Sequence, residues 1–545
     1  MAPPLSRAAR RGILSADSYV AARGRSGRRR STGRRALSQA APTPIAAPPD
    51  LALPTPGAPT GGGGRELDRS LIRGIAWTGA MRWGTQVLSW VSTLIVARLL
   101  APTDYGLVGM AMVYLGLAQL VNEFGLGAAI VTRRDLTESQ IARLGGLALL
   151  LGTGLVALSA LLAAPIARFY GEPAVRWIIV ACSLTFFTAA LQIVPRALLA
   201  RDLDFRRLAW ADGAEALLNT GATLALATVG LRYWALVFGP LVGRTVGTVL
   251  VNAWRPHRIA VPRQFATIAG AVSFGWHIVV ARIAWYLYSN ADFALVGRLL
   301  GKAALGGYTV GWTISSIPID RVTALVASVT GPVFAAVQHD RLALQRYLRH
   351  LTEGLAFITF PTAVGLALVA DVFVLALLGD HWRPAIVPLR LLALSAALRS
   401  VTPLLPQIIV STGHAKRNME FTMAATLIMP ILFYVGARWG TAGVALAWVI
   451  GYPTCVLPMF LAQVLRVTGM TLGAYVRALS PAAGATIVMA AAVLAARFAT
   501  PHAWAPWAVL VTQVATGSAV YAAVLYAAHR HRIGAFLTLV RTFRR

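Results

Sequence analysis

Arginine side chains stand inside several long apolar stretches of this chain, where a charge is costly and marks a site or a pathway. Arg82, Arg244 and Arg282 fall well within such stretches. A guanidinium group stays charged at any working pH, and its fork of N–H donors fits the oxygens of a phosphate. These arginines therefore predict a binding site for an anionic ligand.

Two carboxylates share this setting, Glu123 and Asp320. A carboxylate that pairs with arginine in one state, and is released or protonated in another, would couple ion movement to a change of conformation. Glu123 and Asp320 are therefore predicted to couple the movement of a proton or a sodium ion.

The polar side chains recur at helical spacing. Thr78, Arg82, Gln86, Ser89 and Thr93 follow steps of three or four residues, which place them on one face of a helix. The predicted ligand-binding residues are Arg82, Gln86, Asn122, Arg244, His277, Arg282 and Arg321.

A packing interpretation stays open beside this one, because serine and threonine stripes also join helices in lipid. Asp212 and Glu215 are expected to pair with arginines such as Arg196, which determine topology, and Asp320 can pair with its neighbour Arg321. The sequence leaves both interpretations standing.

Composition defines the elements that must hold these residues. The chain has 545 residues, of which 57% are hydrophobic and 13% charged, and its mean hydropathy is +0.65. Soluble proteins carry about 25% charged residues. Apolar runs of about twenty residues recur, each long enough to cross a bilayer as a helix. The predicted class is an all-α polytopic membrane protein, because only helices or closed barrels satisfy their backbone groups in lipid.

The apolar runs predict about fourteen transmembrane helices. They fall at about 75–97, 104–126, 144–165, 175–195, 209–229, 233–253, 268–290, 305–328, 354–377, 385–407, 419–437, 441–464, 480–498 and 505–528.

The net charge of +30 comes almost entirely from arginine. Arginine is concentrated in the first 70 residues and in alternate loops, as in Arg133-Arg134, Arg206-Arg207 and Arg544-Arg545. The positive-inside rule then predicts that both termini are cytoplasmic and explains the charge without nucleic acid as a partner. The opposite loops are short turns, which leaves no room there for a catalytic domain.

Cys182 and Cys455 lie far apart in separate apolar runs, so no disulfide is expected. No Cys/His spacing indicates a metal site, and no cofactor motif is visible. No catalytic residues are predicted, and the chain is expected not to be an enzyme.

An internal repeat divides the chain. Arg98-Leu99-Leu100 ends one apolar run, and Arg298-Leu299-Leu300 ends another two hundred residues later. Other pairs recur at offsets near two hundred to two hundred and ten. A repeat of six spans is even, so it predicts two six-helix lobes in parallel orientation, with a site between them. The predicted divisions are a disordered basic tail (1–70), an N-lobe (71–264), a C-lobe (265–470), and two further helices with a basic cytoplasmic tail (471–545).

Three segments carry a resemblance to a known family. They are Arg98 to Leu107 (RLLAPTDYGL), Phe124 to Ile130 (FGLGAAI) and Arg196 to Arg206 (RALLARDLDFR). In order and spacing they resemble the polysaccharide transport family of oligosaccharide flippases, within the multidrug/oligosaccharidyl-lipid/polysaccharide exporter superfamily. The resemblance covers about residues 70–530. It implies a flippase for undecaprenyl-pyrophosphate-linked oligosaccharide in capsule, exopolysaccharide or O-antigen synthesis, which works by alternating access in the bacterial cytoplasmic (inner) membrane. Its implied partners are this lipid-linked anionic oligosaccharide, membrane lipids, and a coupling proton or sodium ion.

Other functions fit parts of the pattern. A lipid II flippase or a cation-coupled drug exporter would belong to the same superfamily, and a drug exporter should carry more intramembrane acids in a less basic cavity. A membrane polysaccharide polymerase or glycosyltransferase would place catalytic loops outside, where this chain has only turns.

Overall fold

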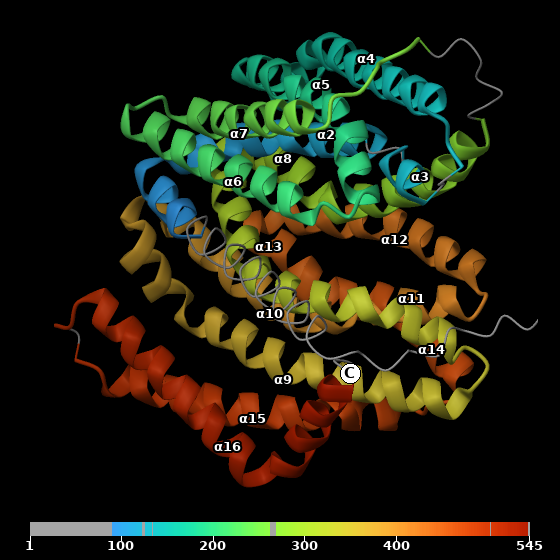
Figure 1. Ribbon diagram of the computed structural model, residues 1–545. Helices are drawn as coiled ribbons and strands as arrows, with labels where there is room; N and C mark the ends of the chain where they lie inside the picture. The colour runs from blue at the N-terminus through green and yellow to red at the C-terminus, as the bar shows by residue number, and fades with distance from the viewer. Residues whose placement is uncertain (1–89, 123–125, 133–134, 262–268, 502, 543–545) are drawn as a thin grey trace, which may run out of the picture. The chain divides into compact units, whose positions relative to one another are not determined.

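The computed structural model describes residues 90–122, 126–132, 135–261, 269–501 and 503–542 of the chain (Figure 1). Side chains are described in these ranges except for positions 269–281, 325, 327–329 and 529–542. The predicted N-terminal tail lies outside the described residues. The described residues are almost entirely helical and contain no strand, as the all-α prediction requires.

The helices follow one another along the chain. After a first helical segment at Trp90–Leu99, they are α2 (Pro102–Asn122), α3 (Leu126–Thr132), α4 (Glu138–Tyr170), α5 (Ala174–Arg201), α6 (Phe205–Thr228), α7 (Tyr233–Trp254), α8 (Ala269–Ala336), α9 (Arg341–Phe373), α10 (Ile386–Val401), α11 (Leu404–Ser411), α12 (Ala415–Gly436), α13 (Gly440–Leu446), α14 (Leu457–Thr468), α15 (Leu472–Ala499) and α16 (Pro506–Thr542). Val374–Leu378 and Ala447–Val456 are π-helical, and Asp380–Ala385 and Ala437–Trp439 are short 3₁₀ turns.

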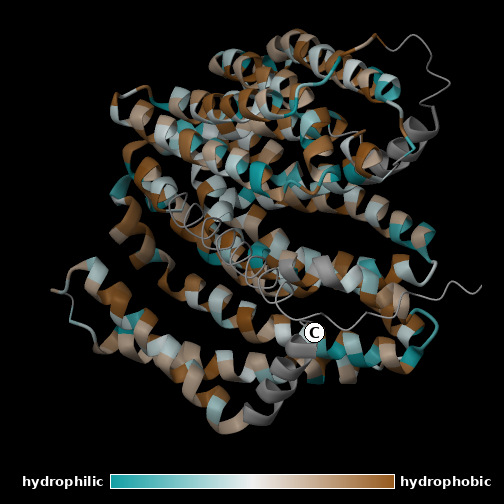
Figure 2. Cartoon of the chain, viewed as in Figure 1, coloured by the Kyte–Doolittle hydropathy of each residue, from teal (hydrophilic) through white to brown (hydrophobic). Residues whose placement is uncertain are grey.

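Each of the fourteen predicted spans overlaps a helix, the first only from residue 90 onward. Within the described ranges, nine helical segments are long and apolar enough to cross a membrane, and they cover the second, third, fourth, sixth and ninth to fourteenth predicted spans. Hydrophobic residues dominate these helices (Figure 2). A polytopic membrane fold is therefore confirmed, and the number of fourteen crossings stays a prediction.

Local sequence signals define several helix ends. Thr137 and Gln140 form a capping box before α4: the Thr137 hydroxyl accepts from the Gln140 amide, and the Gln140 side chain accepts from the Thr137 amide. Gly171, with φ +72°, ends the same helix in the left-handed conformation that glycine adopts most easily. Asp204 caps α6 by accepting from the Arg207 amide at 3.1 Å.

A glycine ladder on α7 brings α6 and α7 into close contact. Gly239, Gly243 and Gly247 are spaced four residues apart and face α6, where a β-carbon on any of them would come within 2.6 Å of an α6 atom. Small residues at this spacing let helix backbones approach closely in lipid. The ladder therefore fixes α6 against the helix that carries Arg244.

The other helix contacts organise the remaining chain. α2 packs along α8, α4 packs along α5, and α5 also packs against α7. α15 and α16 pack on one another and against α9 (Figure 1). α8 changes direction at Gly301, whose φ of +84° interrupts the helical backbone between the seventh and eighth predicted spans.

Candidate functional site

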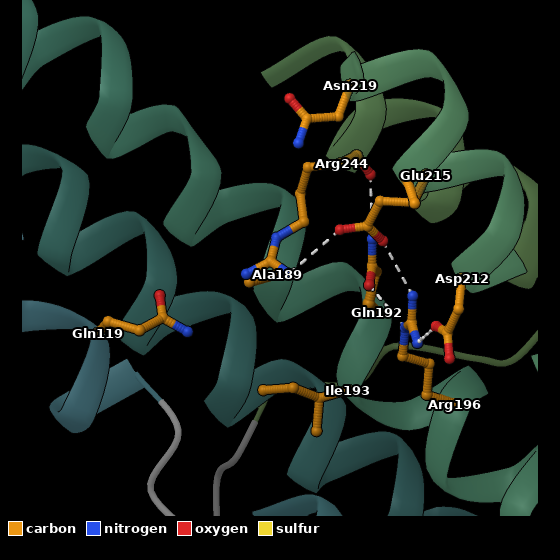
Figure 3. Close-up of a pocket in the computed structure, with 10 residues that line it drawn as sticks. Gln119, Ala189, Gln192, Ile193, Arg196, Asp212, Glu215, Asn219 and Arg244 are labelled. Atoms are coloured by element: carbon orange, nitrogen blue, oxygen red, sulfur yellow. Dashed lines mark hydrogen bonds and ion pairs between the residues drawn. The ribbon is translucent and has the colours of Figure 1, made fainter. Parts of the chain in front are cut away.

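A polar pocket of about 530 Å³ opens among α2, α5, α6 and α7 (Figure 3). Pockets that bind small ligands measure roughly 300–1,000 Å³. It is lined by Gln119, Ala189, Gln192, Ile193, Arg196, Asp212, Glu215, Ala216, Asn219 and Arg244. All of these residues belong to the predicted N-lobe.

Helical spacing gathers the polar residues into one cluster. On α5, Gln192 and Arg196 are four residues apart, so they share a face. On α6, Asp212, Glu215 and Asn219 follow steps of three and four on the face turned to α5 and α7. The close approach of α6 and α7 completes the cluster.

Arg196 is held by three acceptors. Its Nη1 lies 2.5 Å from Asp212 Oδ1, its Nη2 lies 3.0 Å from Glu215 Oε2, and its Nε donates to Gln192 Oε1 at 2.7 Å. The expected pairing of Asp212 and Glu215 with Arg196 is therefore confirmed. An arginine bonded through three of its nitrogens presents its guanidinium in a fixed orientation.

Glu215 bridges the two arginines of the pocket. Its Oε1 lies 3.4 Å from Arg244 Nη1, while its Oε2 faces Arg196 (Figure 3). The Glu215 side chain is 22% exposed, and the two arginine side chains are 28% and 32% exposed. The bridge is therefore partly screened from solvent, where charge–charge interactions are stronger than at an open surface.

The ladder glycines set the position of this carboxylate. A β-carbon at Gly247 would lie 2.6 Å from Glu215 Oε2, and one at Gly243 would lie 2.5 Å from the Glu215 carbonyl oxygen. Only glycine leaves room for the backbone and the carboxylate together. Gln192 ties α5 to α7 beside them by donating to the Arg244 carbonyl at 3.0 Å and to Thr248 Oγ1 at 2.8 Å.

The formal charges of the cluster balance. Arg196, Arg244, Asp212 and Glu215 carry two positive and two negative formal charges, so the cluster is neutral as it stands. An anion that displaced Glu215 would contact the guanidinium groups of Arg196 and Arg244, which both line the pocket. Phosphate oxygens suit such paired forks well.

The structure brings one of the predicted ligand-binding residues, Arg244, to the pocket. Asn122 does not line it: its side chain is buried on α2 and donates to the Phe186 carbonyl at 3.4 Å. Arg282, Asp320 and Arg321 are exposed positions of α8, and none of the three lines this pocket.

The structure does not test the remaining predicted residues. Arg82, Gln86 and Glu123 lie outside the described residues, and His277 belongs to α8 at a position where only the backbone is described. Their roles stay predictions.

A second buried polar cluster lies in the predicted C-lobe. Asp292 is fully buried on α8, where its Oδ2 accepts from the Tyr308 hydroxyl at 2.7 Å and from Trp448 Nε1 at 2.8 Å. The Arg399 guanidinium stacks 4.0 Å from the Trp312 ring centroid. These bonds join α8 to α10 and to the π-helical segment Ala447–Val456, so the cluster fits a structural role in holding this lobe together.

Sequence reasoning did not single out Asp292. The available signal was an aspartate inside an apolar run, together with tyrosine and tryptophan residues able to donate to it. Its partners lie 16 and 156 residues away, which no local spacing reveals.

Solved structures show the class of fold. A structure titled "Lipid II flippase MurJ, inward closed conformation" aligns with a TM-score of 0.67 at 13% identity, over 84% of this chain and all of that one. An inward-facing multidrug resistance transporter of the MATE family aligns with a TM-score of 0.58 at 18% identity, over 70% of this chain and 95% of its own. The chain therefore has the polytopic membrane fold that these two structures share.

The sequence shows the family. Residues 95–388, more than half of the chain, match the family described as "Polysaccharide biosynthesis protein", and the chain belongs to this family. It is 25% identical over 391 residues to the lipopolysaccharide biosynthesis protein WzxC of Escherichia coli, covering 70% of this chain and 79% of that protein.

Further relatives agree. The teichuronic acid biosynthesis protein TuaB of Bacillus subtilis is 24% identical over 70% of this chain and 80% of its own length. The succinoglycan biosynthesis transport protein ExoT of Rhizobium meliloti is 27% identical over 61% of this chain and 67% of its own. The resemblance to polysaccharide transporters is confirmed, and the chain is a multi-pass bacterial membrane protein.

Proposed function

We propose that this protein is a flippase that moves a lipid-linked anionic oligosaccharide from the inner to the outer leaflet of the bacterial cytoplasmic membrane, by alternating access. The substrate that fits best is an oligosaccharide carried on undecaprenyl pyrophosphate. The observation that carries the proposal is the pocket in which Arg196 and Arg244 share Glu215. Membership in a polysaccharide biosynthesis family, with a relative named as a transport protein, supports it.

The pocket suits the pyrophosphate of such a substrate. Two guanidinium groups from neighbouring helices offer paired donors to a diphosphate, whereas a neutral lipid would gain nothing from them. In the predicted topology Arg196 and Asp212 flank the cytoplasmic loop between the fourth and fifth spans. A headgroup that arrives from the cytoplasmic leaflet would therefore reach the pocket first.

Glu215 couples binding of the substrate to uptake of an ion. While it bridges Arg196 and Arg244 the pocket is neutral, and the entering diphosphate must displace it. A displaced carboxylate among apolar helices is costly until it takes up a proton or a cation. This step links substrate binding to ion uptake, and it requires no covalent chemistry on the sugar.

The test is transport in reconstituted vesicles. Purified protein is placed in proteoliposomes with a fluorescent undecaprenyl-pyrophosphate oligosaccharide, and the outer leaflet is probed with a membrane-impermeant glycosidase. Arg196→Ala and Arg244→Ala should each lower the rate of translocation at least about tenfold, because hydrogen bonds to charged groups contribute roughly 1.5–3 kcal/mol.

Arg207→Ala is the matched control. Arg207 lies on the same helix as Glu215 but pairs with Asp204 at the helix start, outside the pocket. It should translocate at the wild-type rate. Wild-type rates in both pocket variants would refute the anionic pocket, and a wild-type protein that moves lipid II but no pyrophosphate-linked polysaccharide precursor would place the chain with lipid II flippases.

A further inference from the structure

We infer that four turns at one end of the helices form a latch that closes the outer face of the transport path and must come apart once in every cycle. The inference rests on the proposed function. The lobe latch consists of residues 97–106, 171–173, 297–306 and 379–385. In the predicted topology all four turns lie on the side of the membrane opposite the termini.

The centre of the latch is a reciprocal contact between α2 and α8. A β-carbon on Gly106 would lie 1.8 Å from the Lys302 carbonyl oxygen, and one on Gly306 would lie 1.7 Å from the Pro102 carbonyl oxygen. Both glycines therefore contact backbone atoms, which cannot rotate away as the end of a flexible side chain can. Closure at this point requires glycine on both helices.

The two contacts are copies of each other. Pro102 and Lys302 are two hundred residues apart, as are Gly106 and Gly306, so each turn presents the same position to the other. Exchange of equivalent contacts is the signature of an isologous interface about a two-fold axis. The repeat seen in the sequence thus becomes a symmetrical junction between the two predicted lobes.

A second layer of contacts follows the same pattern. Lys302 of the C-lobe turn pairs with Glu172 of the N-lobe turn, Nζ to Oε1, at 2.9 Å. In return, Trp382 of the C-lobe turn 379–385 donates from Nε1 to the Ala97 carbonyl of the N-lobe at 2.7 Å. Its buried ring also meets Tyr105 edge-on, with 5.3 Å between centroids. Each lobe therefore uses its second outer turn (171–173 or 379–385) to contact the first outer turn of the other lobe (297–306 or 97–106).

These contacts share one property that fits a gate. They join residues of different predicted lobes, and they lie at the face opposite the arginine-rich loops, while the Arg196–Arg244 pocket lies near those loops. A substrate that entered at the pocket could leave on the other side only if the latch opened. Interfaces of this kind switch between two packings rather than deform gradually.

A cross-link across the latch tests the inference. Cys182 and Cys455 are first replaced by serine, and Glu172→Cys with Lys302→Cys then places two thiols where the ion pair stood, at side chains 24% and 40% exposed. A cleavable bifunctional thiol reagent tolerates a wider gap than a direct disulfide. Cross-linking should lower translocation of the fluorescent substrate more than about tenfold, because gating steps limit turnover, and cleavage should restore it.

The matched control is the pair Asp371→Cys and Arg497→Cys. These residues form an ion pair between α9 and α15, which are not expected to separate, and their side chains are comparably exposed. Cross-linking there should leave the rate unchanged. Full translocation by the cross-linked latch would overturn the inference while leaving the flippase proposal intact, whereas no translocation by the uncross-linked wild type would count against the flippase itself.

A glycine substitution gives an independent measurement. Gly306→Ala should keep the latch from closing, so a cysteine placed at Gln119 in the pocket should react faster with a membrane-impermeant thiol reagent added from outside. Gly331→Ala on the same helix is the control, because its β-carbon meets nothing within 4 Å. The inference would be overturned if the cysteine at position 119 reacted equally fast in the two variants and size-exclusion chromatography showed both proteins to be folded.

Discussion

Replacement of Glu215 by glutamine separates the charge of the bridge from its shape. Glutamine keeps an acceptor oxygen for Arg196 or Arg244 but removes the negative charge that both arginines share. If the carboxylate occupies the place of the diphosphate, its neutralisation should make the pocket a better anion site. The variant should therefore bind inorganic pyrophosphate more tightly than the wild type.

The magnitude follows from the two ion pairs. At 3.0 and 3.4 Å each has a gross Coulomb energy of about 5 kcal/mol with an effective dielectric constant of 20. Desolvation cancels most of this, and a hydrogen bond to a charged group contributes about 1.5–3 kcal/mol net. Loss of one such competing interaction corresponds to a gain in affinity of about ten- to a hundredfold.

The assay is isothermal titration of detergent-solubilised protein with pyrophosphate, followed by translocation in proteoliposomes. Tighter binding should come with slower turnover and weaker dependence on the ion gradient, because release no longer gains from return of the carboxylate. Glu420→Gln is the control, since Glu420 pairs with Arg417 at the start of α12, away from the pocket. Pyrophosphate affinity equal to or weaker than that of the wild type would refute the displacement mechanism.

Three further predictions concern packing, binding and coupling. Gly243→Leu should lower thermal stability and translocation together, because its β-carbon would lie 2.5 Å from the Glu215 carbonyl and overpacking costs about 1–3 kcal/mol; Gly221→Leu, at a position with open space, should leave the melting temperature near that of the wild type. Arg282→Ala should abolish translocation with membrane insertion intact, and Glu123→Gln should change the dependence on a proton or sodium gradient. Unchanged transport by the Arg282 variant would remove Arg282 from its predicted role. Unchanged gradient dependence of the Glu123 variant, measured with imposed ion gradients, would do the same for Glu123.

Much of the fold could be predicted from the sequence, because a bilayer allows few structures. Apolar runs of about twenty residues must become helices, and each predicted range does overlap a helix. The features that could not be predicted are local. One of them, the π-helical segment at Ala447–Val456, depends on tertiary packing rather than on composition.

The sequence predicted a site for an anionic ligand but identified only some of the residues that form it. Arg244 was identified because an arginine inside an apolar run is costly, whereas Arg196 was interpreted as a topology determinant because it stands near a loop. The structure assigns it to the same cluster through Glu215. The glycine ladder that makes this possible is a spacing of four residues on α7, and its partner helix could not be read from sequence alone.

The most direct test of the account is a deletion of the gene in its native host, scored for surface polysaccharide and for the sidedness of lipid-linked oligosaccharide by a membrane-impermeant lectin. The account predicts loss of the surface polymer, with complete lipid-linked oligosaccharide held on the cytoplasmic leaflet, and restoration by the wild-type gene but not by Arg196→Ala. Single repeat units that accumulate on the outer leaflet would instead indicate a polymerase, and unchanged glycans would contradict a role in polysaccharide export.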